Sequence, residues 1–151
     1  MEERDREMPR AELIAKLSAV PGAAPVEERR DGLWMLAPQL DVEAMAREMV
    51  AIGCRLVTMT GLAQKNGETT IIYHYVRGHE VINFKTVTRN GAIPSLAPML
   101  RPASWIEREI HDFFAVNFVG HPNLVPLLRP ASLKDGFFRD PEPGSTVPEK
   151  Q

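Results

Sequence analysis

This sequence has only one cysteine, and it lacks long apolar runs and an excess of charge of one sign. Its single cysteine, Cys54, excludes a disulfide within the chain and an iron-sulfur cluster held by cysteines of this chain alone. No apolar run approaches the roughly 20 residues that a membrane-spanning helix requires. The net charge of -2 gives no basic field, which disfavours nucleic acid as a partner. We therefore expect a cytoplasmic protein without direct membrane insertion.

Length and proline distribution indicate one folded unit with an extended end. A chain of 151 residues that is 44% hydrophobic is large enough to bury a core of its own. All thirteen prolines but four lie at or after Pro94, and prolines at this density do not build a core. We predict a single α+β domain over residues 1–122 and an extended C-terminal arm or tail over residues 123–151.

Apolar spacing and turn residues predict the elements of this domain. Asp41 is placed to cap a helix whose apolar residues follow three-four-three spacing up to Gly53. Runs that alternate or are rich in β-branched residues predict strands at 33–37, 55–61, 69–77 and 80–88. Asn66-Gly67 and Gly78-His79 supply turns, and residues 21–32 are predicted to form a loop. Together they predict a four-stranded mixed sheet with helices on one face and a crossover between the first two strands.

A further helix is predicted within the segment ASWIEREIHDFFAVNFVGHP, residues 103–122. Ser104 followed three residues later by Glu107 is typical of a capping box, which predicts a helix start near Trp105. The helix carries one apolar stripe, formed by Ile106, Ile110, Phe113 and Phe114. Residues four apart can pair on its other faces, and the two such pairs are Arg108 with Asp112 and Glu107 with His111.

The charged side chains of this helix allow three interpretations. They can form a solvated, salt-bridged outer face. They can instead meet the arginines and backbone amides of a partner. The third interpretation is a catalytic metal site, whose candidate ligands are Glu107, His111, Asp112 and His121. It is disfavoured because a zinc peptidase uses two histidines four apart with a glutamate beside the first.

The remaining polar residues suggest no self-sufficient active site. Cys54 is interpreted as a small buried hydrophobic residue and not as a nucleophile. His74 lies within a predicted strand and His79 in a turn, and neither has an evident partner in the sequence. The glycines are isolated turn residues and do not form a phosphate-binding loop.

A motif within residues 103–122 resembles that of a known family. Its matching residues are Glu107, Arg108, Glu109, Asp112, Phe114, Gly120, His121 and Pro122. This pattern resembles the thirty-kilodalton subunit of respiratory complex I, the NADH:quinone oxidoreductase (an NADH dehydrogenase), and the related subunit of membrane-bound [NiFe] hydrogenases. The resemblance covers roughly residues 42–140.

The resemblance implies a non-catalytic accessory subunit of a membrane-anchored oxidoreductase complex. Such a subunit binds no cofactor and packs against the large subunit, which carries the quinone or nickel-iron site, while iron-sulfur clusters lie on other partner subunits. It would be peripheral to the inner face of the cell membrane, and its C-terminal arm would run along the large subunit. The implied interface or fold-locking residues are Trp105, Glu107, Arg108, Glu109 and Asp112, with Phe114 and Gly120 as further motif residues and His121 and Pro122 fixing the exit of the arm.

Three positions depart from the family pattern. Ala115 replaces the usual glycine, and Val125 and Pro126 replace paired arginines after Gly-His-Pro. The spacing to Arg139-Asp140 is shortened, and the chain is short for the respiratory form. These departures favour an energy-converting or formate-linked hydrogenase over an NADH:quinone oxidoreductase. The alternatives are a stand-alone protein-binding module and, after it, an independent metal-dependent enzyme.

Overall fold

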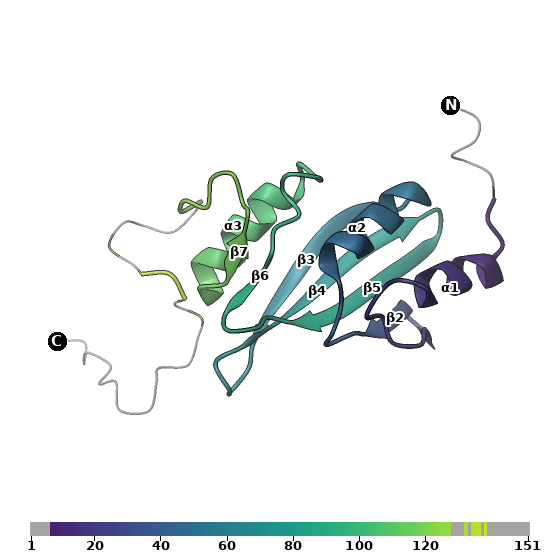
Figure 1. Ribbon diagram of the computed structural model, residues 1–151, viewed down its shortest axis with the longest axis horizontal. Helices are drawn as coiled ribbons and strands as arrows, with labels where there is room; N and C mark the ends of the chain where they lie inside the picture. Colours follow the sequence, from purple (N-terminus) through teal and green to yellow (C-terminus); the bar gives the residue numbers. More distant parts are fainter. Residues whose placement is uncertain (1–6, 128–131, 133, 137, 139–151) are drawn as a thin grey trace.

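The computed structural model describes residues 7–127, 132, 134–136 and 138. A five-stranded mixed sheet is covered on one face by helices, and a two-stranded sheet lies beside the last helix (Figure 1). The elements are α1 (Arg10–Ser18), β1 (Glu27–Arg29), β2 (Gly32–Leu36), α2 (Val42–Ala51), β3 (Arg55–Ala63), β4 (Thr69–Arg77), β5 (Glu80–Val87), β6 (Ala92–Pro94), α3 (Ala103–Phe114) and β7 (Asn117–Val119). The α+β class predicted from the sequence is confirmed.

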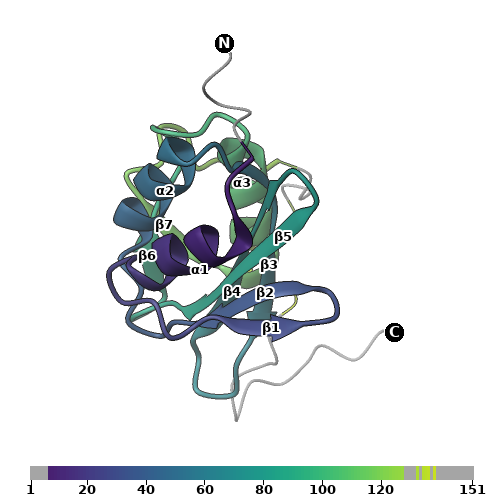
Figure 2. The same ribbon diagram turned by 90° about the vertical axis from the view of Figure 1, so that its right-hand side faces the viewer.

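The large sheet has the strand order β1-β2-β5-β4-β3. β3, β4 and β5 form two antiparallel hairpins, whose turns contain Asn66-Gly67 and Gly78-His79 as predicted. β2 pairs in parallel with β5, so β2 and β3 run in the same direction with two strands between them. α2 connects them across one face, which gives the predicted crossover. Figure 2 shows the helices gathered on one side of the sheet.

Four strands were predicted for this sheet, and the structure has five. The additional strand, β1, lies in the segment 21–32 that was predicted to be a loop. Its three residues, Glu-Glu-Arg, are all exposed, so no apolar alternation marks them. Backbone pairing with β2 holds them in place, and the guanidinium of Arg29 lies 4.9 Å from the ring centroid of Trp34. The sequence patterns did not predict β6 and β7, because each strand has only three residues.

α2 forms as its sequence pattern predicts. The carboxylate of Asp41 accepts a hydrogen bond of 3.0 Å from the backbone N–H of Ala44, which caps the helix. Cys54 follows the helix and is buried in the core. Burial raises the pKa of its thiol to about 11, so the thiolate is disfavoured and the predicted role as a buried hydrophobic residue agrees with the structure.

One glycine of β3 determines where α3 lies. A Cβ added at Gly61 would come within 2.9 Å of the Phe114 ring and 3.3 Å of Ile110. The helix therefore packs directly on the β3 backbone, and its apolar residues Ile106, Ile110 and Phe114 join the main core. This packing fixes the position of the motif helix on the helix-covered face of the sheet.

Candidate functional site

The motif helix begins two residues earlier than the sequence predicted. α3 starts at Ala103, with Pro102 at its N-cap, and no side chain caps it. The predicted capping box is therefore wrong. The Ser104 hydroxyl instead lies 3.3 Å from Nε2 of His121. Backbone N–H groups of the first turn are satisfied locally, because Ala103 donates to Leu100 and Ser104 donates to Arg101.

Glu107 is buried and supports the loop between β6 and α3. Its side chain has no exposed surface, and its Oε2 accepts a hydrogen bond of 2.6 Å from the Ser95 hydroxyl. Its Oε1 accepts one of 2.7 Å from the backbone N–H of Leu96. Burial raises the pKa of this carboxyl to about 7, while both hydrogen bonds act in the opposite direction. Glu107 thus belongs to neither a solvated face nor the predicted pair with His111.

The burial of Glu107 had a signal in the sequence. Glu107 lies four residues after Ala103 and three before Ile110, and both are buried. It therefore occupies a core position of the helical repeat, although its charge suggested an outer face.

His121 joins the Gly-His-Pro turn to α3. Its side chain is buried, with Nε2 3.1 Å from the Ser104 carbonyl oxygen and 3.9 Å from Oε2 of Glu107. Nδ1 accepts a hydrogen bond of 2.9 Å from the backbone N–H of Asn123. In the tautomer that fits these partners, Nε2 carries the proton and donates to Ser104. Gly120, at φ +86°, supplies the left-handed residue of the turn.

Arg108 and Asp112 bind the backbone of the arm instead of each other. Arg108 donates from Nε to the Val125 carbonyl at 3.0 Å and from Nη2 to the Pro126 carbonyl at 2.9 Å. Asp112 is buried and accepts from the backbone N–H of Leu127 at 3.0 Å. We call Arg108 and Asp112 the arm-binding pair. Because these three hydrogen bonds reach backbone groups, they accommodate the side chains of Val125 and Pro126 that depart from the family pattern.

Residues of the arm contact the C-terminal end of α3. Gly136 donates its backbone N–H to the Asp112 carbonyl at 2.8 Å, and Phe138 donates to Phe113 at 2.9 Å. These bonds satisfy carbonyls that a helix end leaves free. The rings of Phe113 and Phe138 stack with centroids 4.5 Å apart. The predicted correspondence at Arg139-Asp140 lies outside the described residues.

The helix ends at Ala115, which adopts a left-handed conformation with φ 56° and ψ 28°. Its N–H donates to the His111 carbonyl at 2.9 Å. Glycine is the residue that this conformation favours, because a Cβ is strained there. The position where the resemblance expects glycine is therefore a helix C-terminus that needs positive φ.

The outward side of α3 is formed by Trp105 and Glu109. Trp105 is 68% exposed, the highest value among the large hydrophobic residues that the structure describes. Glu109 is exposed one turn further along and makes no ion pair with a described residue. The four charges of the motif helix therefore separate into three that hold this chain together and one that faces outward.

The candidate metal ligands do not converge. Glu107 and His121 lie together, but His111 places Nδ1 2.8 Å from the Val116 carbonyl and Nε2 3.8 Å from Asp135. The carboxylate of Asp112 instead accepts a hydrogen bond from the backbone N–H of Leu127. Among the described residues, no group of three or more histidine, cysteine or acidic side chains is arranged to hold a metal ion.

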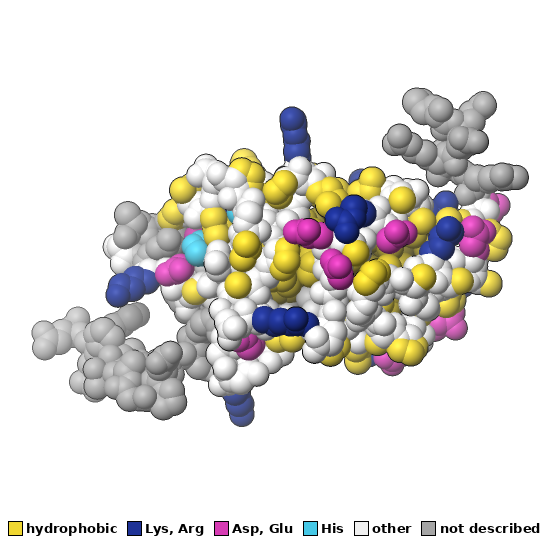
Figure 3. Space-filling view, in the orientation of Figure 1, with side chains coloured by type: hydrophobic (Ala, Val, Ile, Leu, Met, Phe, Trp, Pro, Cys, Tyr) yellow, Lys and Arg dark blue, Asp and Glu magenta, His cyan; other side chains and the backbone are white. Residues whose placement is uncertain are grey.

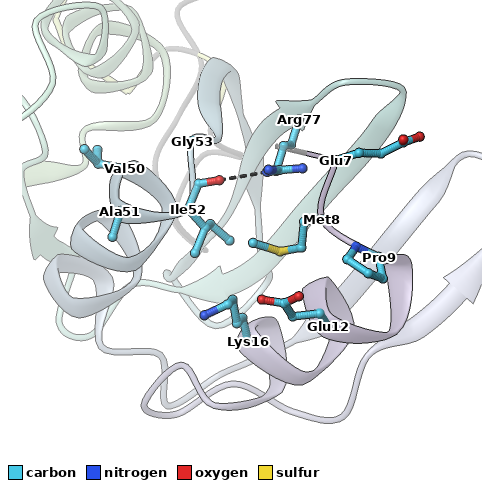
Figure 4. A pocket seen from close by; sticks show the side chains of 10 residues that line it. All are labelled: Glu7, Met8, Pro9, Glu12, Lys16, Val50, Ala51, Ile52, Gly53 and Arg77. Carbon is cyan, nitrogen blue, oxygen red and sulfur yellow. Dashed lines mark hydrogen bonds between the residues drawn. The ribbon is translucent and has the colours of Figure 1, made fainter. Parts of the chain in front are cut away.

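A surface hollow lies at the other end of the domain, between α1, the end of α2 and the β4–β5 hairpin (Figure 4). Its volume is about 850 Å³, and its wall mixes the apolar side chains of Met8 and Ile52 with the charged Glu12 and Lys16. Arg77 donates from Nε to the Ile52 carbonyl at 2.7 Å. These residues line a surface depression between elements, and they do not place a nucleophile beside a base.

His74 has two partners in the structure, although none was evident in the sequence. Nε2 lies 2.8 Å from the Thr60 hydroxyl and Nδ1 lies 2.6 Å from Oδ1 of Asn83. Asn83 donates in turn to the Leu33 carbonyl at 3.3 Å. This chain of hydrogen bonds crosses β3, β4, β5 and β2, and such cross-strand neighbours are set by register, which a single sequence does not reveal.

Comparisons with known proteins indicate the same family as the motif does. Residues 38–143 match the family described as "Respiratory-chain NADH dehydrogenase, 30 Kd subunit". The chain is 34% identical over 70 residues to the NADH-ubiquinone oxidoreductase 30.4 kDa subunit of Neurospora crassa, covering 44% of this chain and 25% of that protein. It is 30% identical over 74 residues to a subunit of the NADH-quinone oxidoreductase of Caulobacter sp. (strain K31), covering 46% and 35%. The matches thus span about a quarter to a third of these relatives.

Two solved structures share the fold. One belongs to the membrane-bound sulfane sulfur reductase, an archaeal respiratory membrane complex, with a TM-score of 0.62, 24% identity and coverage of 72% of this chain and 69% of the other. The other is a trypsin-resistant fragment of Nqo5, with a TM-score of 0.55, 23% identity and coverage of 68% and 90%. In the part of the chain that the structure describes, no helix is long and apolar enough to cross a bilayer. Since the family match takes in residues 38–143, this protein belongs to the family of the 30 kDa subunit of the respiratory-chain NADH dehydrogenase.

Proposed function

We propose that this chain is a non-catalytic accessory subunit of a membrane-anchored electron-transfer complex, where it packs against the large redox subunit. The observation that carries the proposal is what the charged side chains of the motif contact. Glu107, Arg108 and Asp112 direct their hydrogen bonds to this chain's own backbone and loops. The arrangement positions an arm and a helix face, which is the work of an assembly subunit and not of an enzyme.

In this proposal the chemistry belongs to other chains. Iron-sulfur clusters and the quinone or nickel-iron site lie on partner subunits, and this chain holds no cofactor. It is cytoplasmic and reaches the inner face of the membrane through its partners. Its C-terminal arm runs along the large subunit, with its first part fixed to α3 by the arm-binding pair.

The type of complex is a separate question. Val125 and Pro126 contributed to the expectation of a hydrogenase-type complex, but both contact Arg108 through their carbonyls. Their side chains therefore do not distinguish a hydrogenase from an NADH:quinone oxidoreductase. Ala115 retains the conformation in which glycine is expected, so it does not separate the two types either. We propose that the complex is either a hydrogenase or an NADH:quinone oxidoreductase, and that the presence of nickel distinguishes the first from the second.

The test is isolation of the tagged full chain from its native cell under mild conditions. Peptide mass spectrometry identifies the chains that accompany it, and elemental analysis measures iron and nickel. We expect a large redox subunit and iron in amounts comparable to the tagged chain, with nickel present only in a hydrogenase. A chain that brings down no redox subunit is instead a stand-alone binding module, and zinc or iron bound to the chain alone would indicate an independent metal enzyme.

A further inference from the structure

A groove at one end of the large sheet is lined mainly by apolar side chains. Two adjoining hollows of about 310 and 220 Å³ form it, and both have Pro38, Thr86 and Val87 in their walls. The larger hollow also has residues of α2 and β6 in its wall, and Figure 3 shows hydrophobic side chains gathered between these two elements. We call the two hollows the end groove. No described residue of α3 or of the arm lines it, so it is a separate surface from the motif helix.

One edge of β5 is free along this groove. The parallel ladder with β2 ends where Ala37 donates its backbone N–H to the Lys85 carbonyl at 2.8 Å. On the other side of β5, Thr88 donates its N–H to β4 at 2.9 Å. Hydrogen-bonded and non-hydrogen-bonded positions alternate along antiparallel strands, so Val87 turns its N–H and C=O away from β4 and toward the groove. No described strand lies beside them, and a backbone edge of this kind can pair with one more strand.

The charge of the end groove is positive. Of the described residues in its wall, only Lys85 and Arg89 are charged, one in each hollow. Both are exposed, and neither forms an ion pair with a described residue, although Arg89 donates from Nη2 to the Gln39 side chain. The backbone between them lies in β5 and in the bridge that follows it, so the two side chains start about 13 Å apart. The groove therefore presents two cations without carboxylate partners, with the free strand edge between them.

These features fit an extended acidic peptide and disfavour other occupants. A second copy of this chain would bring the same cations against each other. Anionic membranes are recognised by clusters of about four to eight Lys or Arg residues, and this groove has two. A fatty acid carries one carboxylate and cannot pair with a strand edge. An extended segment with two acidic residues four apart spans the same about 13 Å and brings backbone groups to Val87.

We propose that the end groove binds an extended segment of another protein chain. The backbone of this segment pairs with Val87, its apolar side chains fill the two hollows, and its acidic residues, four apart, lie beside Lys85 and Arg89. The proposal goes beyond the proposed function, because it concerns a surface that neither α3 nor the described part of the arm contributes to. It adds a partner of stated chemistry to the arm and the motif helix.

A synthetic peptide tests the chemistry of the groove. The probe is the acetylated and amidated peptide Thr-Glu-Ile-Val-Ile-Glu-Thr, added at up to millimolar concentration to the ¹⁵N-labelled full chain. We expect its amide shifts to concentrate at residues of the end groove, such as Val87 and Ala92, and hydrogen exchange of the Val87 amide to slow. The control peptide has lysine in place of both glutamates and is expected to cause no shifts. Absence of shifts with the acidic peptide, shifts elsewhere on the chain, or equal shifts with both peptides would overturn the proposal.

A charge reversal tests the role of the cations. Lys85→Glu is expected to weaken binding of the acidic peptide at least about tenfold, because a carboxylate then faces a carboxylate. The matched control Lys16→Glu, at an exposed position of α1, is expected to leave binding unchanged. A peptide with lysine in place of the glutamate that faces position 85 is expected to restore binding to Lys85→Glu. Equal binding by Lys85→Glu and the original chain would contradict the proposed contact.

Photo-crosslinking in the native cell tests whether the groove is used there. Benzoylphenylalanine replaces Val119, which is 55% exposed in the wall of the groove, and the control replaces Val50, which is 52% exposed on α2. We expect light to link position 119, but not position 50, to a segment of another chain that carries acidic residues four apart. A link to a second copy, to residues 139–151 of the same chain, or to a segment without acidic residues would overturn the proposal.

The two proposals fail separately. If the tagged chain recovers a large redox subunit but its end groove binds no acidic peptide, the groove proposal falls and the proposed function stands. If the groove binds the acidic peptide but the tagged chain recovers no redox subunit, the proposed function falls and the groove proposal stands.

Discussion

Arg108 and Pro126 are joined by a hydrogen bond of 2.9 Å from Nη2 to the carbonyl oxygen. The same guanidinium donates from Nε to the Val125 carbonyl at 3.0 Å, so its planar fork spans two consecutive backbone groups. Proline offers a carbonyl but no N–H, and the contact uses only the carbonyl. The arm is therefore recognised by the path of its backbone, which explains how it tolerates a proline and a valine at these positions.

The stability of the chain is predicted to fall as pH rises, because of Glu107. Its pKa is raised from the ordinary 4.5 to about 7 in the folded state, so folding favours the protonated carboxyl. The resulting stability is fully present below about pH 4.5 and is lost as pH rises to about 7, by about 3 kcal/mol. Urea unfolding of the full chain across this range measures the change.

Glu107→Gln is the control for this prediction. Its amide oxygen can still accept from Leu96, and its amide nitrogen can donate to the Ser95 hydroxyl, so the loop contacts are retained. The difference in unfolding free energy between the original chain and the variant should change across the same pH range. Parallel curves would show that Glu107 does not titrate in this way.

Ala115→Gly is predicted to stabilise the fold by about 1 kcal/mol. The residue has φ 56°, where glycine avoids the strain of a Cβ. For a chain of this length, that gain corresponds to a rise in Tm of about 3 °C. Ala15→Gly in the middle of α1 is the matched control, and it should lower stability by about 1 kcal/mol because its helix is right-handed. Equal effects of the two substitutions on the melting temperature would contradict the assigned conformation.

Gly61→Ala is predicted to destabilise the chain by about 1 to 3 kcal/mol, because the new methyl group would lie 2.9 Å from the Phe114 ring. Phe114→Leu replaces that ring with a smaller aliphatic side chain and gives the second arm of a double-mutant cycle. Denaturant unfolding should show that the double variant loses less stability than the sum of the single variants. Strict additivity would mean that the helix does not pack on the β3 backbone at this point.

The sequence was sufficient for the elements whose signals are local. The hairpins followed from alternation and turn residues, and α2 followed from the Asp41 cap, which the structure reproduces. β1 was missed because three exposed charged residues carry no apolar pattern. Its pairing with β2 is a tertiary property, which local propensity does not contain.

The candidate site was only partly predictable for a related reason. The residues of the motif were identified, but their partners were not, because Leu96 and Leu127 lie 11 and 15 residues from the side chains that they contact. Spacing along a helix suggested that Arg108 and Asp112 pair with each other. Both instead bind backbone groups of a segment whose path is set by the Gly-His-Pro turn.

Arg108 is predicted to matter for assembly more than for folding. Its two hydrogen bonds lie at the surface, so Arg108→Ala should lower the unfolding free energy by no more than about 1 kcal/mol. Release of the arm should nevertheless weaken binding to the large subunit. Arg108→Lys is the intermediate variant, because an ammonium group lacks the rigid fork that spans two carbonyls.

The most direct measurement compares two quantities for Arg108→Ala and the original chain. The first is the unfolding free energy of the purified full chain, and the second is the fraction of chain that migrates with the large redox subunit on native gels of cell extracts. We predict nearly unchanged stability and a several-fold smaller assembled fraction. An unfolded variant, or a folded variant that assembles as well as the original, would contradict the assignment of the motif helix to assembly through the arm.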